Sequence, residues 1–233
     1  MVTSIILISV GMVLMSVFIY GKITNYSMRT VIIKTLTSIL FVDLAVYLFA
    51  ASKFKIIGLF FIFGAFFGLL GDVVLGLKRV YTQHDKLFTF LGFVSFAIGH
   101  IFYVSGLYTY LYIPGNYLYI LIPLLIALVI GSLVLVVEKV LHVSFGKLKI
   151  VAFIYLTILS SLSLCSGSLS ILYQFKSIFL ILVFVGGLLF ALSDLILSRT
   201  YFRSNPKKIE LILCSVTYYF AQFLIAFSLF FIW

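Results

Sequence analysis

Two aspartates that lie inside long apolar segments are the residues of this sequence best placed to do chemistry. Asp72 stands in "GLLGDVVLGLKR" (68–79), and Asp194 stands in "GGLLFALSDLILS" (186–198). A charge at the middle of a bilayer costs about 2.5–3.5 kcal/mol, so such a residue faces a wet interior or a partner. Two carboxyl groups at one site hold their protons unequally, so one can serve as acid and the other as base. The pair predicts acid–base chemistry, with a structural role beside hydroxyl donors or Lys34 as the alternative.

Small residues surround Asp72 on its own helix. Gly64, Gly68, Asp72 and Gly76 recur every four residues, so they share one face of a helix. Small residues let a neighbouring helix or a substrate come close to the backbone. We therefore expect something to pack tightly beside Asp72.

Three further polar residues lie in apolar segments. His100 is predicted to relay a proton or orient water, and a hydrogen-bonded core histidine is the alternative. Tyr103 is one helical turn further on and can share its network. Lys34 either reaches to the lipid headgroups, partners the aspartates or, together with the basic residues of the loops, draws a lipid phosphate.

Metal and nucleophile motifs do not account for this set of residues. A catalytic zinc site commonly takes three protein ligands rich in histidine, and His84 and His142 fall in connecting loops. The sequence contains no HExxH, no GxSxG and no glycine loop of the phosphate-binding kind. This argues against a zinc-dependent intramembrane hydrolase, although spacing alone leaves a Ser/His/Asp arrangement open.

The elements that position these residues follow from composition. The chain is 64% hydrophobic and 9% charged, whereas a soluble domain carries about 25% charged residues, so we predict a polytopic membrane protein. A hydrocarbon core of about 30 Å needs about 20 apolar residues per helix. The expected fold is an all-α bundle of eight transmembrane helices forming a single transmembrane domain over 1–233, the first span being retained rather than cleaved. The expected spans are 2–20, 31–50, 56–77, 87–112, 118–137, 150–173, 178–198 and 211–232.

The loops predict how the bundle is oriented. Connections one, three, five and seven carry 12 of the 16 Lys and Arg residues, and the other three connections carry 3. Basic loops stay in the cytoplasm, so both termini are expected outside, in what we take to be a bacterial inner membrane. The net charge of +10 is spread over these loops, so it predicts topology and not nucleic-acid binding.

The chain also matches itself at an offset of 122 residues. Segment 64–76 then falls on 186–198, so that Asp72 meets Asp194 and, further on, His100 meets Gln222. An offset of four spans predicts two parallel four-helix repeats, 1–115 and 116–233, about an axis along the membrane normal. In that arrangement the two aspartates are mates facing a shared centre. Chance alignment of apolar sequence is the alternative.

Four segments in order resemble the YhhN family of lysoplasmalogenases: "GLLGDVVLGL", "FAIGHIFY", "GGLLFALSDLIL" and "YYFAQFLIA". "IIKTLTS" resembles the family's second helix, except that Thr35 stands where the family typically has proline. The resemblance implies cleavage of the vinyl ether of a lysophospholipid or ether-lipid substrate in the bilayer. The products are a fatty aldehyde and a glycerophospho-alcohol, and the implied reaction uses no metal or organic cofactor.

The resemblance also implies roles for individual residues. Vinyl ethers hydrolyse through protonation of the β-carbon, capture of the oxocarbenium ion by water and collapse of the hemiacetal, which needs a proton donor and an anion. By position, the matching residues are Asp72, Asp194, His100, Tyr103 and Gln222. The predicted catalytic residues are Asp72, Asp194 and His100, and the predicted substrate-binding residues are Lys34, Tyr103, Tyr155, Ser193, Tyr219 and Gln222.

Two other functions fit the same features. Repeated halves and buried aspartates suit a proton-coupled transporter of a small or lipid-like solute equally well. A lipid-binding regulatory membrane protein is the third reading. The sequence leaves the headgroup and the oligomeric state open.

Overall fold

The structure is a computed structural model that describes residues 1–51, 56–110, 116–140, 149–202 and 207–232, with the backbone alone for 134–140 and 199–202. Eight α-helices of 21–25 residues make up most of these residues. They are α1 (Val2–Thr24), α2 (Met28–Ala51), α3 (Ile56–Lys78), α4 (Asp85–Thr109), α5 (Leu118–Val140), α6 (Lys149–Leu172), α7 (Ile178–Phe202) and α8 (Lys208–Ser228). Short 3₁₀ turns, Thr82–His84 and Leu229–Phe231, precede α4 and follow α8.

The predicted helical membrane bundle is largely confirmed. Within the described residues, seven helices are long and apolar enough to cross a membrane, as in a multi-pass membrane protein. The described apolar stretch of α5, Leu118–Leu133, is shorter, so the eighth span stays a prediction. The fourth helix ends at Thr109 and not at residue 112, and residues 111–115 lie outside the described ones.

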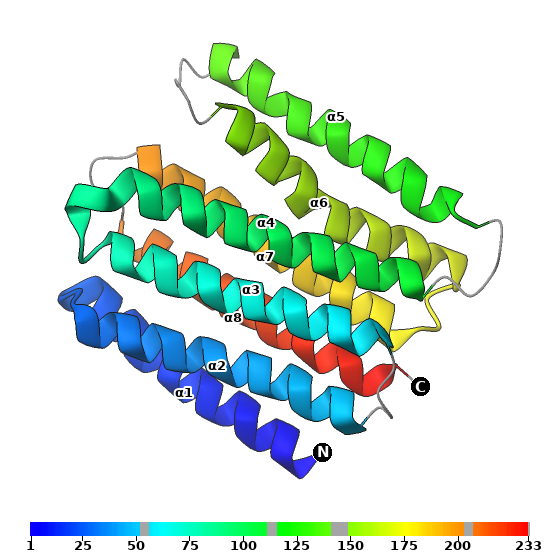
Figure 1. Cartoon of the computed structure of the whole chain (residues 1–233), viewed down its shortest axis with the longest axis horizontal. Coiled ribbons are helices and arrows are strands. Elements are labelled where there is room, and N and C mark those ends of the chain that lie inside the picture. Colours follow the sequence, from blue (N-terminus) through cyan, green and yellow to red (C-terminus); the bar gives the residue numbers. More distant parts are fainter. Residues whose placement is uncertain (52–55, 111–115, 141–148, 203–206, 233) are drawn as a thin grey trace.

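The chain runs up and down. Figure 1 shows that the C-terminal ends of α1, α3, α5 and α7 lie at one end of the bundle, while both termini lie at the other. We call the first the basic end, because α1, α3, α5 and α7 each precede an odd-numbered connection, and these connections carry 12 of the 16 Lys and Arg residues; residues 141–148 and 203–206 of them lie outside the described ones. The odd- and even-numbered connections therefore alternate between the two ends of the bundle, as predicted. The assignment of the basic end to the cytoplasm stays a prediction.

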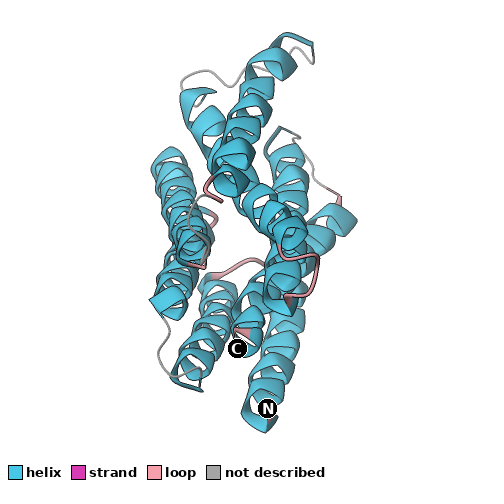
Figure 2. Ribbon diagram, turned by 90° about the vertical axis from the view of Figure 1, so that its right-hand side faces the viewer, coloured by secondary structure: helices cyan, strands magenta, loops and turns pink. Residues whose placement is uncertain are grey.

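The helices pack in a pattern that recurs partly in the two halves. Helix α2 packs against α1, α3 and α8, and helix α6 packs against α5, α7 and α4. The halves differ at their first helices, because α1 also packs against α8 while α5 stands at the edge of the bundle beyond α6 (Figure 1). Figure 2, turned by 90°, shows that the bundle is more than one helix deep. Two parallel repeats remain a prediction.

Small residues bring α3 close to its neighbours. A Cβ atom at Gly64 would lie 2.4 Å from the ring of Tyr103 on α4, and one at Gly68 would lie 2.9 Å from Nε2 of Gln222 on α8. Side chains of neighbouring helices therefore fill the small stripe at these two positions. Asp72 lies on the same stripe, so these contacts help to fix its surroundings.

Candidate active site

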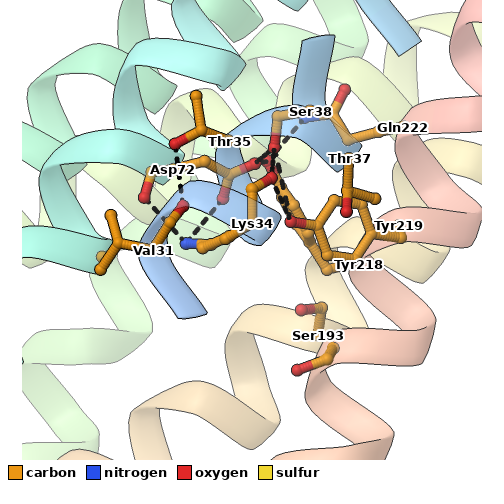
Figure 3. A network of polar contacts seen from close by, with 12 residues as sticks. Val31, Lys34, Thr35, Thr37, Ser38, Asp72, Ser193, Tyr218, Tyr219 and Gln222 are labelled. Carbon is orange, nitrogen blue, oxygen red and sulfur yellow. Dashed lines mark hydrogen bonds and ion pairs between the residues drawn. The ribbon is translucent and has the colours of Figure 1, made fainter. Parts of the chain in front are cut away.

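Asp72 is the centre of a buried polar network. The residue is 1% exposed, and Lys34 Nζ lies 2.8 Å from its Oδ1 and also donates to its backbone carbonyl at 3.1 Å. Ser38 Oγ and Tyr218 Oη donate to Oδ2 over 2.5 and 2.7 Å. Lys34 and Ser38 are four residues apart on α2, so one helix face presents both. Figure 3 shows these side chains converging on Asp72 from α2 and α8.

This arrangement stabilises Asp72 as a carboxylate. Hydrogen bonds to an ionised group are shorter and about twice as strong as neutral ones. Both carboxylate oxygens are engaged, and the lysine side chain is itself only 13% exposed. Two ions taken out of water hold each other in place when their remaining hydrogen-bonding positions are filled. Of the readings open for Lys34, the structure supports partnership with an aspartate.

A second layer of hydrogen bonds supports the network. Tyr219 Oη donates to the Lys34 carbonyl at 3.2 Å, and Gln222 Nε2 donates to Tyr218 Oη at 3.4 Å. Tyr103 Oη in turn donates to Gln222 Oε1 at 3.2 Å. Tyr103 and Gln222 therefore reach Asp72 through Tyr218 and not directly.

Asp194 lies in simpler surroundings. It is half-buried on α7, and its Oδ2 accepts a hydrogen bond from the Tyr155 hydroxyl of α6. Among the described residues, no cation pairs with it. The neighbouring Ser193 donates to the Cys214 carbonyl at 2.9 Å, so its hydroxyl links α7 to α8.

The two aspartates line one cavity. This cavity has a volume of about 190 Å³ and lies toward the basic end, between α1, α2, α3, α4, α7 and α8. Of the predicted site residues, Lys34, Asp72, Ser193, Asp194 and Tyr219 line it. The other four predicted residues, His100, Tyr103, Tyr155 and Gln222, do not line it.

His100 has a packed environment. It is 2% exposed, its Nδ1 lies 2.9 Å from the Phe96 carbonyl oxygen, and its ring meets that of Phe190 edge-on at 4.5 Å. Its Nε2 has no hydrogen-bond partner within the described part of the chain. Because Nδ1 faces a carbonyl oxygen, we assign the proton to Nδ1. The geometry matches the core-histidine alternative better than a relay that touches substrate.

Some residues of the site were not singled out by number in the sequence. Ser38 and Tyr218 contact Asp72 directly, and Lys22 and Arg79 line the cavity. Tyr218 lies four residues before Gln222, so helical spacing was a signal that could have found it. Lys22 and Arg79 stand beside helix ends, where a basic residue is ordinarily interpreted as a topology signal. Within the described residues, no three His, Cys, Asp or Glu side chains gather as metal ligands.

The family model of the YhhN family matches residues 29–229, which run from the start of α2 to the end of α8. The chain belongs to the YhhN family. The match includes both aspartates of this YhhN protein and the residues that contact them, while α1 with Lys22 precedes it. No curated protein and no solved structure matches the chain.

Proposed function

We propose that this YhhN protein is a membrane-embedded hydrolase that cleaves the vinyl ether of lysoplasmalogen-type lipids. The YhhN family includes lysoplasmalogenases. One observation carries the proposal: two carboxyl groups line the same cavity, and only one of them is tied to a cation among the described residues. Vinyl ether hydrolysis needs such an unequal pair, one group that gives a proton and one anion that steadies a cation.

The surroundings assign the two roles. Asp72 is the anion, because Lys34, Ser38 and Tyr218 all direct hydrogens at its carboxylate. Asp194 is the acid, because it has no cation partner among the described residues and keeps Oδ1 for its own proton while Oδ2 accepts from Tyr155. Unequal carboxyl groups of this kind are the usual division of labour in acid–base catalysis.

The reaction balances with one water molecule. Asp194 gives its proton to the β-carbon of the vinyl ether, and the oxocarbenium ion forms beside the Asp72 carboxylate. Water adds to the α-carbon and returns a proton to Asp194. The hemiacetal then collapses: its hydroxyl proton passes to the glycerol oxygen, the bond from carbon to that oxygen breaks, and the aldehyde forms. Each protein group ends the cycle in its starting state.

The cavity walls suit a lipid with one polar end. Phe18, Leu75 and Phe96 give part of the lining an apolar character. A site shielded by such walls strengthens the interaction between the Asp72 charge and a nearby cation. The basic residues near the cavity place it at the basic end, which we propose faces the cytoplasm.

Aldehyde release tests the proposal. Purified protein incubated with a 1-alkenyl lysophospholipid is expected to yield a fatty aldehyde, measured by mass spectrometry. Asp72→Asn and Asp194→Asn are each expected to reduce release by about 10²–10⁴-fold, the usual contribution of a general acid or base. The saturated 1-alkyl ether is the matched control, since it cannot be protonated at carbon. Turnover close to that of the wild type in either variant contradicts the assignment.

A proton-coupled transporter is the second candidate. It is favoured by the packing of α2 and α6, which each contact three comparable helices in the two halves. Proton-driven solute uptake into vesicles, in the absence of aldehyde release, would identify a transporter.

A further inference from the structure

Two cations of the cavity remain without a carboxylate partner in the described residues. Lys22 Nζ donates to Ser215 Oγ at 2.6 Å and to the Leu211 carbonyl at 3.3 Å. The Arg79 guanidinium lies over the ring of Tyr26, 5.1 Å from its centroid. These two differ from the other two cations of the cavity, Lys34 and Lys78, which pair with Asp72 and Asp85.

Both cations are held in place by their neighbours. Lys22 is within the last turn of α1, and its two acceptors on α8 leave one of its three N–H groups free. Tyr26 donates to the Gly76 carbonyl at 3.3 Å, which fixes the ring beneath Arg79. A guanidinium stacked on an aromatic ring keeps its fork of donors available for an anion with several oxygens.

We propose that Lys22 and Arg79 bind the phosphate of a single-chain phospholipid substrate. The inference rests on the proposed function, since it names the group that orients the substrate in the same cavity. The charges support it. Asp72 is paired with Lys34 and Asp85 with Lys78, so among the described residues Lys22 and Arg79 are the lining cations without a carboxylate partner. Two fixed cations and a planar fork match a phosphate diester in charge and shape.

The lengths also agree. Arg79 follows Asp72 by seven residues, which corresponds to about 10 Å along a helix axis. In a lysoplasmalogen, roughly seven bonds separate the phosphorus from the β-carbon of the vinyl ether, or about 8–9 Å when extended, by analogy with polypeptide bond lengths. A phosphate held near Arg79 therefore lets the vinyl ether reach the level of the aspartates.

The test compares substrates with and without phosphate. Wild type, Lys22→Gln and Arg79→Gln are assayed on a 1-alkenyl-glycerophosphoethanolamine and on the phosphate-free 1-alkenylglycerol. Each substitution is expected to lower the ratio of the two kcat/KM values by about tenfold, chiefly through KM, because one charged hydrogen-bonding partner is lost. Lys86→Gln and Arg29→Gln are the matched controls, because both residues are exposed and neither lines the cavity. An unchanged ratio in both cavity variants overturns the inference.

A binding arm separates this inference from the hydrolase proposal. Binding of a 1-alkyl lysophospholipid, which lacks the vinyl group, is compared with binding of a 1-alkylglycerol in detergent, and the thermal melt of each variant checks folding. If no aldehyde forms but the phosphate analogue binds more tightly and depends on Lys22 and Arg79, the hydrolase fails and the phosphate site stands. If the 1-alkyl lysophospholipid and the 1-alkylglycerol bind equally tightly, the proposed phosphate site is overturned.

Two competitors identify the source of the phosphate. If the site is built for a single-chain lipid, neither inorganic phosphate nor a diacyl phospholipid is expected to displace the analogue at equal concentration. Displacement by inorganic phosphate indicates a site for free anions, and displacement by the diacyl lipid indicates an ordinary headgroup site at the bilayer surface. Either result overturns the assignment to substrate.

Discussion

Asp72 and Asp194 align with each other at an offset of 122 residues, yet the structure gives them unlike surroundings. Asp72 is fully buried and engaged by a lysine and two hydroxyl groups, whereas Asp194 is half-buried and accepts one hydrogen bond from Tyr155. The difference teaches that matched positions in a sequence alignment need not share their hydrogen-bond partners. Under the proposed function, Asp72 is the fixed anion and Asp194 is the group that exchanges a proton.

The sequence explains this asymmetry. At the same offset, Lys34 corresponds to Leu156 and Tyr218 corresponds to Phe96, so two of the three groups that hold Asp72 have apolar counterparts, while Ser38 corresponds to Ser160. Tyr155, which serves Asp194, corresponds to Ile33. The positions of the acids match while their supporting residues differ, and this difference creates an unequal pair from two similar helices.

The largest contrast is expected in stability. Asp72→Asn leaves Lys34 in a nearly buried site without its counter-ion, and breaking such a pair lowers the free energy of unfolding by about 3–5 kcal/mol. Asp194→Asn is expected to cost less than about 1 kcal/mol, because the amide oxygen still accepts from Tyr155. Unfolding by heat or by a denaturing detergent measures both. Equal losses would show that the two aspartates are not distinguished by their partners.

A double variant is the control for that contrast. Replacing both members of the pair, Lys34→Met with Asp72→Asn, removes the unpaired charge. The double variant is therefore expected to be more stable than Asp72→Asn alone, although it stays inactive. If its stability is the sum of the two single losses, the ion pair is not what holds this region together.

The hydroxyl groups offer a smaller contrast. Tyr218→Phe removes one of several donors to Asp72 and is expected to lower stability by about 1.5–3 kcal/mol, as for a hydrogen bond to a charged group. Tyr155→Phe removes the side-chain donor that orients Asp194, and a misplaced acid costs about 10²-fold in turnover. Rates of aldehyde release and unfolding curves of both variants check this. The proposed difference between the two aspartates is contradicted if Tyr218→Phe releases aldehyde more slowly than Tyr155→Phe and Tyr155→Phe is the less stable variant.

Periodicity and length account for what could be predicted of the fold. The spans follow from runs of about 20 apolar residues, and the helix ends agree with them to within a few residues. The predicted partnership of Lys34 with an aspartate likewise follows from the cost of unpaired charges in an apolar region.

The rest depends on tertiary contacts that spacing does not reveal. Ser38 is one of many serines on the helices, and only the packing of α2 against α3 directs its hydroxyl at Asp72. Tyr155 was predicted to bind substrate, but the structure places its hydroxyl on Asp194 and leaves it outside the cavity lining. Lys22 was assigned to a loop, and only the extra turn of α1 beside α8 brings it to the cavity.

The smallest effect is expected at His100, which belongs to neither aspartate's contacts. His100→Asn keeps a donor for the Phe96 carbonyl and loses mainly the ring contact with Phe190. A relay histidine would lower turnover by about 10²–10⁴-fold, whereas a packed one should change it by less than about threefold. The loss of stability should stay near 1 kcal/mol, because the buried hydrogen bond is retained. Aldehyde release by His100→Asn and its melting curve decide between the two roles. A hundredfold loss in a fully folded variant would return His100 to the catalytic set. Its Nε2, which has no partner among the described residues, would then have to reach the reacting atoms through a movement of Phe190.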